Sequence, residues 1–132
     1  MTTLEFYTTL SALWIGLCWA PYILDRAFTR GLMGAMANPG PDAAPQSAWA
    51  QRAMRAHTVA VESFVAFAPL SLMAMTRLPD DSYPGTLAMA YFFAIVAHYI
   101  IYVLGIPVLR TLAFVVAALS TAALALRLFG VI

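Results

Sequence analysis

The chain has 132 residues, of which 63% are hydrophobic and only 10% are charged, and its mean hydropathy is +0.83. A soluble domain carries charge at about a quarter of its positions, so this composition excludes a soluble protein and indicates an integral membrane protein whose first partner is the lipid bilayer. The formal net charge of +1, which seven arginines produce against six acidic residues, gives no basis for binding nucleic acid.

Four apolar segments are separated by polar or helix-breaking residues, and each is long enough to supply the roughly 20 residues that a membrane-spanning helix needs. These segments lie at about residues 4–24, 48–76, 85–104 and 108–129. The polar turn Leu78–Pro84 precedes the third segment, and Gly105–Pro107 breaks the helix before the fourth. We therefore predict an all-α, four-helix membrane bundle that forms one domain over residues 1–132.

The longest connection between spans runs from Asp25 to Ser47, and its Gly, Ala and Pro content predicts an extended segment. Five of the seven arginines lie on the same side of the membrane as this connection: Arg26, Arg30, Arg52, Arg55 and Arg110. Because cytoplasmic loops carry an excess of basic residues, we expect the long connection in the cytoplasm and both termini on the opposite side.

The leading half of the second span contains four ionisable residues, Arg52, Arg55, His57 and Glu62. An ionisable group at bilayer depth costs about 2.5–3.5 kcal/mol on insertion scales, so such groups usually face a bundle interior or a wet cavity. A helix turns by about 100° per residue, which places Arg55, Val59 and Glu62 on one face. This face is a candidate functional surface.

Polar residues on the next two spans are expected at the same level of the bundle. Tyr91, His98 and Tyr102 follow helical spacing on the third span, and Arg110 with Thr111 begins the fourth. Arginines offer fork-shaped donors for carboxylates. An arginine beside a thiol also lowers the pKa of that thiol and favours the nucleophilic thiolate. The set therefore suits a flexible anionic ligand.

Structural roles are an alternative for several of these residues. Arg52 and Arg55 lie near the membrane boundary, where arginines extend towards lipid headgroups, and Glu62 could form an ion pair between helices. A single histidine such as His98 is more often a hydrogen-bonded core residue than a catalytic one. Because no Cys/His cluster accompanies His57 and His98, we predict no metal site.

Two segments carry a resemblance to a known family. Arg52–Glu62 reads RxxRAH with a glutamate five residues later, and Ala97–Phe114 reads AHYxxY followed by GIPVLRTLAF. Both occur in order on the expected spans, and Ala37–Pro39 (ANP) lies in the long first loop. Over nearly its whole length the chain resembles a divergent, bacterial-type member of the MAPEG family, membrane-associated proteins in eicosanoid and glutathione metabolism.

The resemblance implies a homotrimer whose clefts between subunits bind glutathione near the cytoplasmic face. The glutathione-binding positions would be Arg52, Arg55, His57, Glu62, His98 and Tyr102. The catalytic residues would be Arg110, which stabilises the thiolate, and Thr111, whose hydroxyl assists. The implied activity is that of a glutathione transferase or peroxidase, in which glutathione is a co-substrate and a lipophilic electrophile enters from the bilayer.

The chain departs from the usual family pattern at two positions. Val59 stands where relatives commonly have asparagine, and Ile95 stands where they commonly have arginine. These apolar residues motivate a second hypothesis, a non-catalytic accessory subunit of a larger membrane complex. Its cleft would hold a lipid tail, and a headgroup phosphate would bind to arginines, namely Arg52, Arg55 and Arg110.

Overall fold

A computed structural model describes residues 1–132 as five α-helices without β-strands. The helices are α1 (Thr3–Leu17), α2 (Ala20–Met36), α3 (Ala48–Arg77), α4 (Tyr83–Leu104) and α5 (Pro107–Leu128). The continuous α1–α2 segment and the other three helices are each long and apolar enough to cross a membrane. The predicted all-α architecture with four membrane-spanning segments is confirmed.

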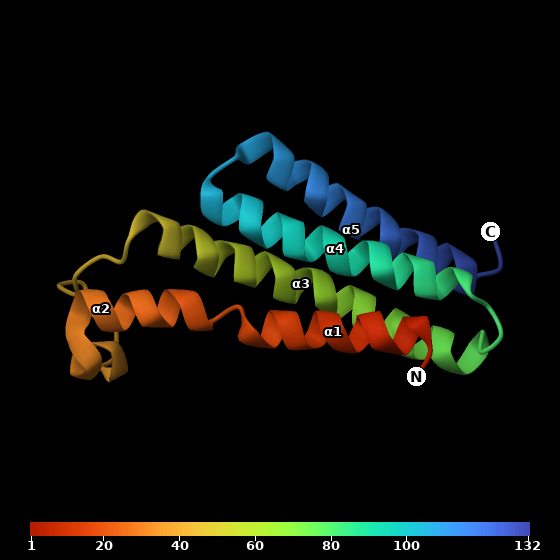
Figure 1. The fold of residues 1–132 in the computed structure, drawn as a ribbon, viewed down its shortest axis with the longest axis horizontal. Coiled ribbons are helices and arrows are strands. Elements are labelled where there is room, and N and C mark those ends of the chain that lie inside the picture. The colour runs from red at the N-terminus through yellow and green to blue at the C-terminus, as the bar shows by residue number, and fades with distance from the viewer.

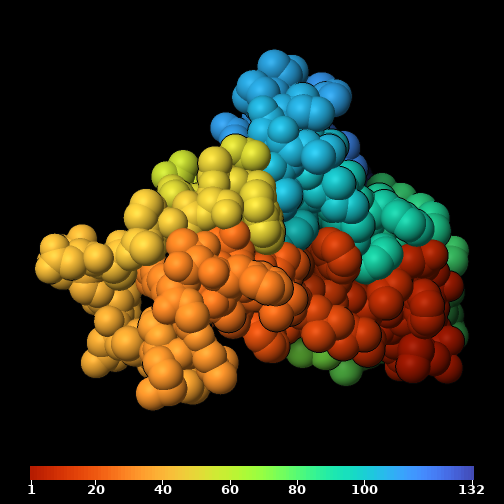
Figure 2. Space-filling model, turned by 60° about the vertical axis from the view of Figure 1, so that its left-hand side comes forward, coloured from red at the N-terminus to blue at the C-terminus, as the bar shows by residue number.

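The long helices α3 and α4 pack together, and both α1 and α5 pack on this pair, while α2 contacts α3. Figure 1 shows α5 and α1 on opposite sides of the pair, with both termini at one end of the bundle. The other end carries α2, the loop after it and the turn between α4 and α5. In Figure 2 this turn stands out at the top of the molecule, and the loop after α2 projects at the left.

The first span contains a break that the sequence pattern did not predict. Helix α1 begins at a capping box, in which the backbone N–H of Glu5 donates to Thr2 Oγ1 at 3.2 Å. It ends at Leu17, and α2 begins two residues beyond Cys18 with Pro21 in its first turn. Proline lacks an N–H group and fits the first turn of a helix, so Pro21 starts a new helix here.

The prediction of an extended connection from Asp25 to Ser47 was wrong for its first half. Helix α2 reaches Met36 as two helical pieces joined across a kink at Gly31, whose φ of +73° and ψ of 166° are not helical. Ala, Leu, Met and Arg on either side of the glycines are good helix formers, so both pieces are helical although the glycine content suggested a loop. The irregular part of the connection is confined to residues 37–47.

Polar contacts fasten this shorter connection to α2. The Asp25 carboxylate accepts hydrogen bonds from the backbone N–H of Ser47, at 3.0 Å, and from the Ser47 hydroxyl. Arg30 Nε donates to the carbonyl oxygen of Ala44 at 2.8 Å. These bonds satisfy backbone groups just before α3 and fix where α3 begins relative to α2.

The core between α3 and α4 combines small residues with one aromatic pair. Phe67 and Tyr91 are fully buried and stack with ring centroids 3.8 Å apart and planes 4° apart. Alanines let the two helix backbones approach closely: the buried ones are Ala50, Ala53, Ala56, Ala60 and Ala74 on α3, and Ala88 and Ala94 on α4. Ile95 is part of this core and is 3% exposed.

A tight turn joins α4 to α5. Gly105 adopts φ +79°, a left-handed conformation that glycine tolerates best, and the N–H of Ile106 donates to Ile101 O at 3.2 Å. Pro107 then begins α5. The turn therefore places the first residues of α5 beside the last turns of α4.

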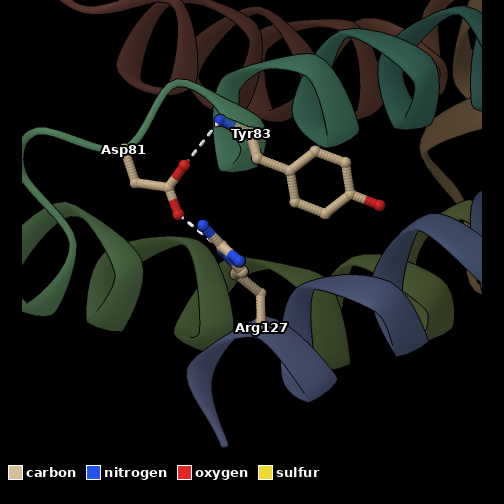
Figure 3. Close-up of polar contacts among 3 residues, drawn as sticks. All are labelled: Asp81, Tyr83 and Arg127. Atoms are coloured by element: carbon tan, nitrogen blue, oxygen red, sulfur yellow. Dashed lines mark hydrogen bonds and ion pairs between the residues drawn. The ribbon is translucent and has the colours of Figure 1, made fainter. Parts of the chain in front are cut away.

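At the opposite end, an ion pair fastens α5 to the turn between α3 and α4 (Figure 3). Arg127 Nε donates to Asp81 Oδ2 at 2.6 Å, and the other carboxylate oxygen accepts from the N–H of Tyr83 at 2.9 Å. The guanidinium lies 5.8 Å from the centroid of the Tyr83 ring. The hydrogen bond from Arg127 lowers the pKa of the Asp81 carboxyl below its ordinary 3.8.

We expect Asp81→Asn to lower the midpoint of thermal unfolding in detergent at neutral pH. Because the folded state lowers the pKa of Asp81, its carboxylate stabilises the fold above the ordinary pKa. That stabilisation is lost as the pH falls through the lowered value, so the difference from the wild type should close below about pH 4. The neighbouring Asp80→Asn, which removes a carboxylate without an ion pair, is the control. An equal loss in both variants would contradict the prediction.

Candidate functional site

A groove of about 430 Å³ opens between α3, α4 and α5, in the half of the bundle that contains the α4–α5 turn. This volume lies within the range of about 300–1,000 Å³ that is common for small-molecule sites. Seven residues line the groove: Val59, Glu62 and Ser63 from α3, His98 from α4, and Arg110, Thr111 and Phe114 from α5. Four of them, Glu62, His98, Arg110 and Thr111, are residues that the sequence analysis predicted for the site.

Glu62 and Arg110 bring opposite charges into the groove, but they do not pair. The structure contains one ion pair, between Asp81 and Arg127, and neither groove residue makes a side-chain hydrogen bond to the protein. The alternative role for Glu62, an ion pair between helices, is therefore absent from this chain. Both charges are free to bind charged groups of a ligand.

Aromatic contacts hold Arg110 and His98 in place. The guanidinium carbon of Arg110 lies 4.3 Å from the centroid of the Tyr102 ring, which is a cation–π contact. His98 is 5% exposed and packs edge-on against Tyr102, with centroids 5.5 Å apart, and against Phe114 at 6.0 Å. The His98 ring makes no hydrogen bond to the protein, so its nitrogens remain available to a ligand. Tyr102 thus supports the groove without lining it.

The structure does not bring Arg52, Arg55 and His57 to the groove. Arg52 Nε donates to the carbonyl oxygen of Val103 at 2.9 Å and so ties α3 to the end of α4. Arg55 is exposed and does not line the groove. His57 Nδ1 lies 2.8 Å from the Tyr22 hydroxyl, on the side of α3 that faces α2.

Ser63 and Phe114 line the groove although the sequence analysis did not predict them as site residues. Helical spacing could have found both, because Ser63 lies four residues after Val59 and Phe114 lies four after Arg110. Of the two positions that depart from the family pattern, Val59 lines the groove, whereas Ile95 lies in the core.

The groove offers binding and acid–base groups rather than a metal centre. No group of three or more His, Cys, Asp or Glu side chains lies close enough to hold a metal ion. One carboxylate, one guanidinium, one imidazole and two hydroxyls face a ligand, beside the apolar side chains of Val59 and Phe114. Such a set can bind a ligand that carries both charges and can stabilise an anion next to Arg110.

Comparison with known proteins places this chain in a family. The sequence profile of the MAPEG family matches residues 4–130, whereas a search of curated proteins found no significant match. The profile covers nearly the whole chain, including every residue that lines the groove and all five helices apart from Thr3. The protein therefore belongs to the MAPEG family.

Proposed function

We propose that this protein is a glutathione-dependent transferase or peroxidase that acts on lipophilic electrophiles. The observation that carries the proposal is the pair of unpaired opposite charges, Glu62 and Arg110, in one groove. Glutathione carries an ammonium group, two carboxylates and a thiol, so both charges would find a partner. Membership of a family associated with glutathione supports the same ligand.

In the proposed reaction Arg110 lies beside the sulfur and favours the thiolate over the thiol. The thiol proton passes to solvent or to the product. A lone pair on sulfur forms a C–S bond with an electrophilic carbon, and the leaving group departs with the electron pair of the bond that breaks. With a hydroperoxide, two glutathione molecules supply two electrons and yield an alcohol, water and glutathione disulfide. The apolar wall at Val59 and Phe114 would contact the lipophilic partner.

We further propose a homotrimer in which a neighbouring subunit covers the groove. Apolar side chains are exposed on α5 around the groove, which supports contact with a neighbour or with lipid: Val108, Leu109, Leu112, Val115 and Val116. In such an assembly the exposed Arg55 could reach the groove of the next subunit. The excess of arginines at this end of the bundle favours a cytoplasmic location for the groove and the loop after α2.

Arg110→Ala should reduce glutathione conjugation by about tenfold or more, because a hydrogen bond to a charged group is worth about 1.5–3 kcal/mol. The trimer should persist, since the cation–π contact of the Arg110 guanidinium is with Tyr102 of its own subunit. Turnover of a generic electrophile and size-exclusion chromatography in detergent would measure the two effects. Arg77→Ala, at the far end of α3, is the matched control. Parallel loss of trimer and activity would instead indicate a structural role.

Glu62→Gln should weaken glutathione binding by about tenfold, because the ammonium group loses its charged acceptor. A glutathione analogue in which a glutaryl group replaces the γ-glutamyl group lacks that ammonium, and its affinity should be the same for the wild type and the variant. Isothermal titration calorimetry of both ligands in detergent would test this. If the variant loses affinity equally for both ligands, Glu62 does not bind the ammonium.

A second candidate function is that of a lipid-binding accessory subunit. The apolar side chains of Val59 and Phe114 on the groove wall favour it, because an acyl chain could lie along them while Arg110 meets a phosphate. Gentle purification from native membranes distinguishes the two functions. A stoichiometric partner protein would favour the accessory subunit, and an isolated trimer that binds glutathione would favour the enzyme.

A further inference from the structure

The hydroxyl of Ser63 lies at the boundary between the groove and the core. Ser63 lines the groove beside Glu62, and its Oγ lies 3.0 Å from the hydroxyl oxygen of Tyr91. Tyr91 is fully buried and stacks on Phe67. The Tyr91 hydroxyl makes no other hydrogen bond, so Ser63 is its single partner.

The surroundings of the two hydroxyls decide which of them donates. A phenol and a serine can bond in either direction. If Ser63 donated, the phenolic proton of Tyr91 would remain unpaired inside the apolar core, which is unfavourable. If Tyr91 donates, the proton of Ser63 remains free, and a ligand or water in the groove can accept it. The second arrangement satisfies both groups, so Tyr91 is the donor.

Ser63 also differs from several other serines and threonines in these helices. Several of them donate to the carbonyl oxygen one turn earlier, which is the usual bond for such residues: Ser11, Thr58, Thr111, Ser120 and Thr121. Ser63 does not make this bond, because its oxygen faces Tyr91. Thr111 does make it, to Pro107 O at 3.1 Å, so Thr111 offers the groove only oxygen lone pairs.

We propose that Ser63, oriented by Tyr91, donates a hydrogen bond to the thiolate sulfur of bound glutathione. This assignment rests on the proposed function, and it gives Ser63 the role that the sequence analysis assigned to the Thr111 hydroxyl. Arg110 supplies the positive charge, and Ser63 supplies a directed donor on the opposite helix of the groove. Tyr91 touches no ligand and is a positioning residue.

The thiol pKa of bound glutathione, followed by the ultraviolet absorbance of the thiolate, tests the assignment. Ser63→Ala should raise that pKa by about one unit, which is the expected loss of one charged hydrogen bond. Its affinity for S-methylglutathione, which has no thiol, should match that of the wild type. Thr111→Val should raise the pKa less than Ser63→Ala does. A wild-type pKa in Ser63→Ala, or a larger shift in Thr111→Val, would overturn the assignment.

A second series works without glutathione. In a Cys18→Ala background, Ser63→Cys introduces a single thiol, whose pKa follows from the pH dependence of its alkylation by iodoacetamide. Adding Tyr91→Phe should raise this pKa, because the thiolate loses a donor. The control is Tyr99→Phe, whose hydroxyl bonds to Cys18 O away from the groove. An unchanged or lowered pKa with Tyr91→Phe would show that Tyr91 is not the donor.

The two series separate the failure of this inference from the failure of the proposed function. If the wild type does not bind glutathione, the proposed function fails and the thiolate is not the acceptor. The alkylation series still decides whether Tyr91 directs the Ser63 proton into the groove. If glutathione binds and only Ser63→Ala leaves the thiol pKa unchanged, the enzyme proposal survives and the assignment of Ser63 fails.

Discussion

The close packing of α3 against α4 is the constraint on which the rest of this structure depends. Within a membrane, apolar surface alone gives helices little reason to associate, so shape and close contact decide the packing. Alanines allow the approach, and the Phe67–Tyr91 stack fixes the register of the two helices. Ser63 lies one helical turn from Phe67 and His98 lies two turns from Tyr91. The stack therefore fixes the relative positions of the α3 and α4 residues that line the groove, and α5 supplies its third wall.

Much of the fold and part of the site could be predicted from the sequence. Hydropathy located the four spans because a membrane requires long apolar helices, and Gly105 with Pro107 marked the break between the last two. Helical spacing brought Glu62 to the groove, and the short α4–α5 turn brought Arg110 beside His98. These predictions depended on local periodicity, which a sequence carries directly.

The features that sequence reasoning missed depend on contacts between distant residues. His57 lies on the same helix as Glu62, but its ring faces Tyr22 of α2 rather than the groove. The hydroxyl proton of Ser63 is free to point into the groove only because Tyr91, 28 residues away, donates to the Ser63 oxygen. Residue spacing within α3 does not reveal that Tyr22 and Tyr91 are the partners of these two side chains. Such contacts require knowledge of how the helices are rotated about their axes.

The two ends of the bundle are fastened by chemically different bonds. At the end that contains the groove, Arg52 binds the neutral carbonyl oxygen of Val103. At the other end, Arg127 binds the charged and partly exposed Asp81. Mobile ions screen exposed charges strongly but have little effect on a bond to a carbonyl dipole. Rising ionic strength should therefore loosen the end with the termini first, while the walls of the groove keep their spacing.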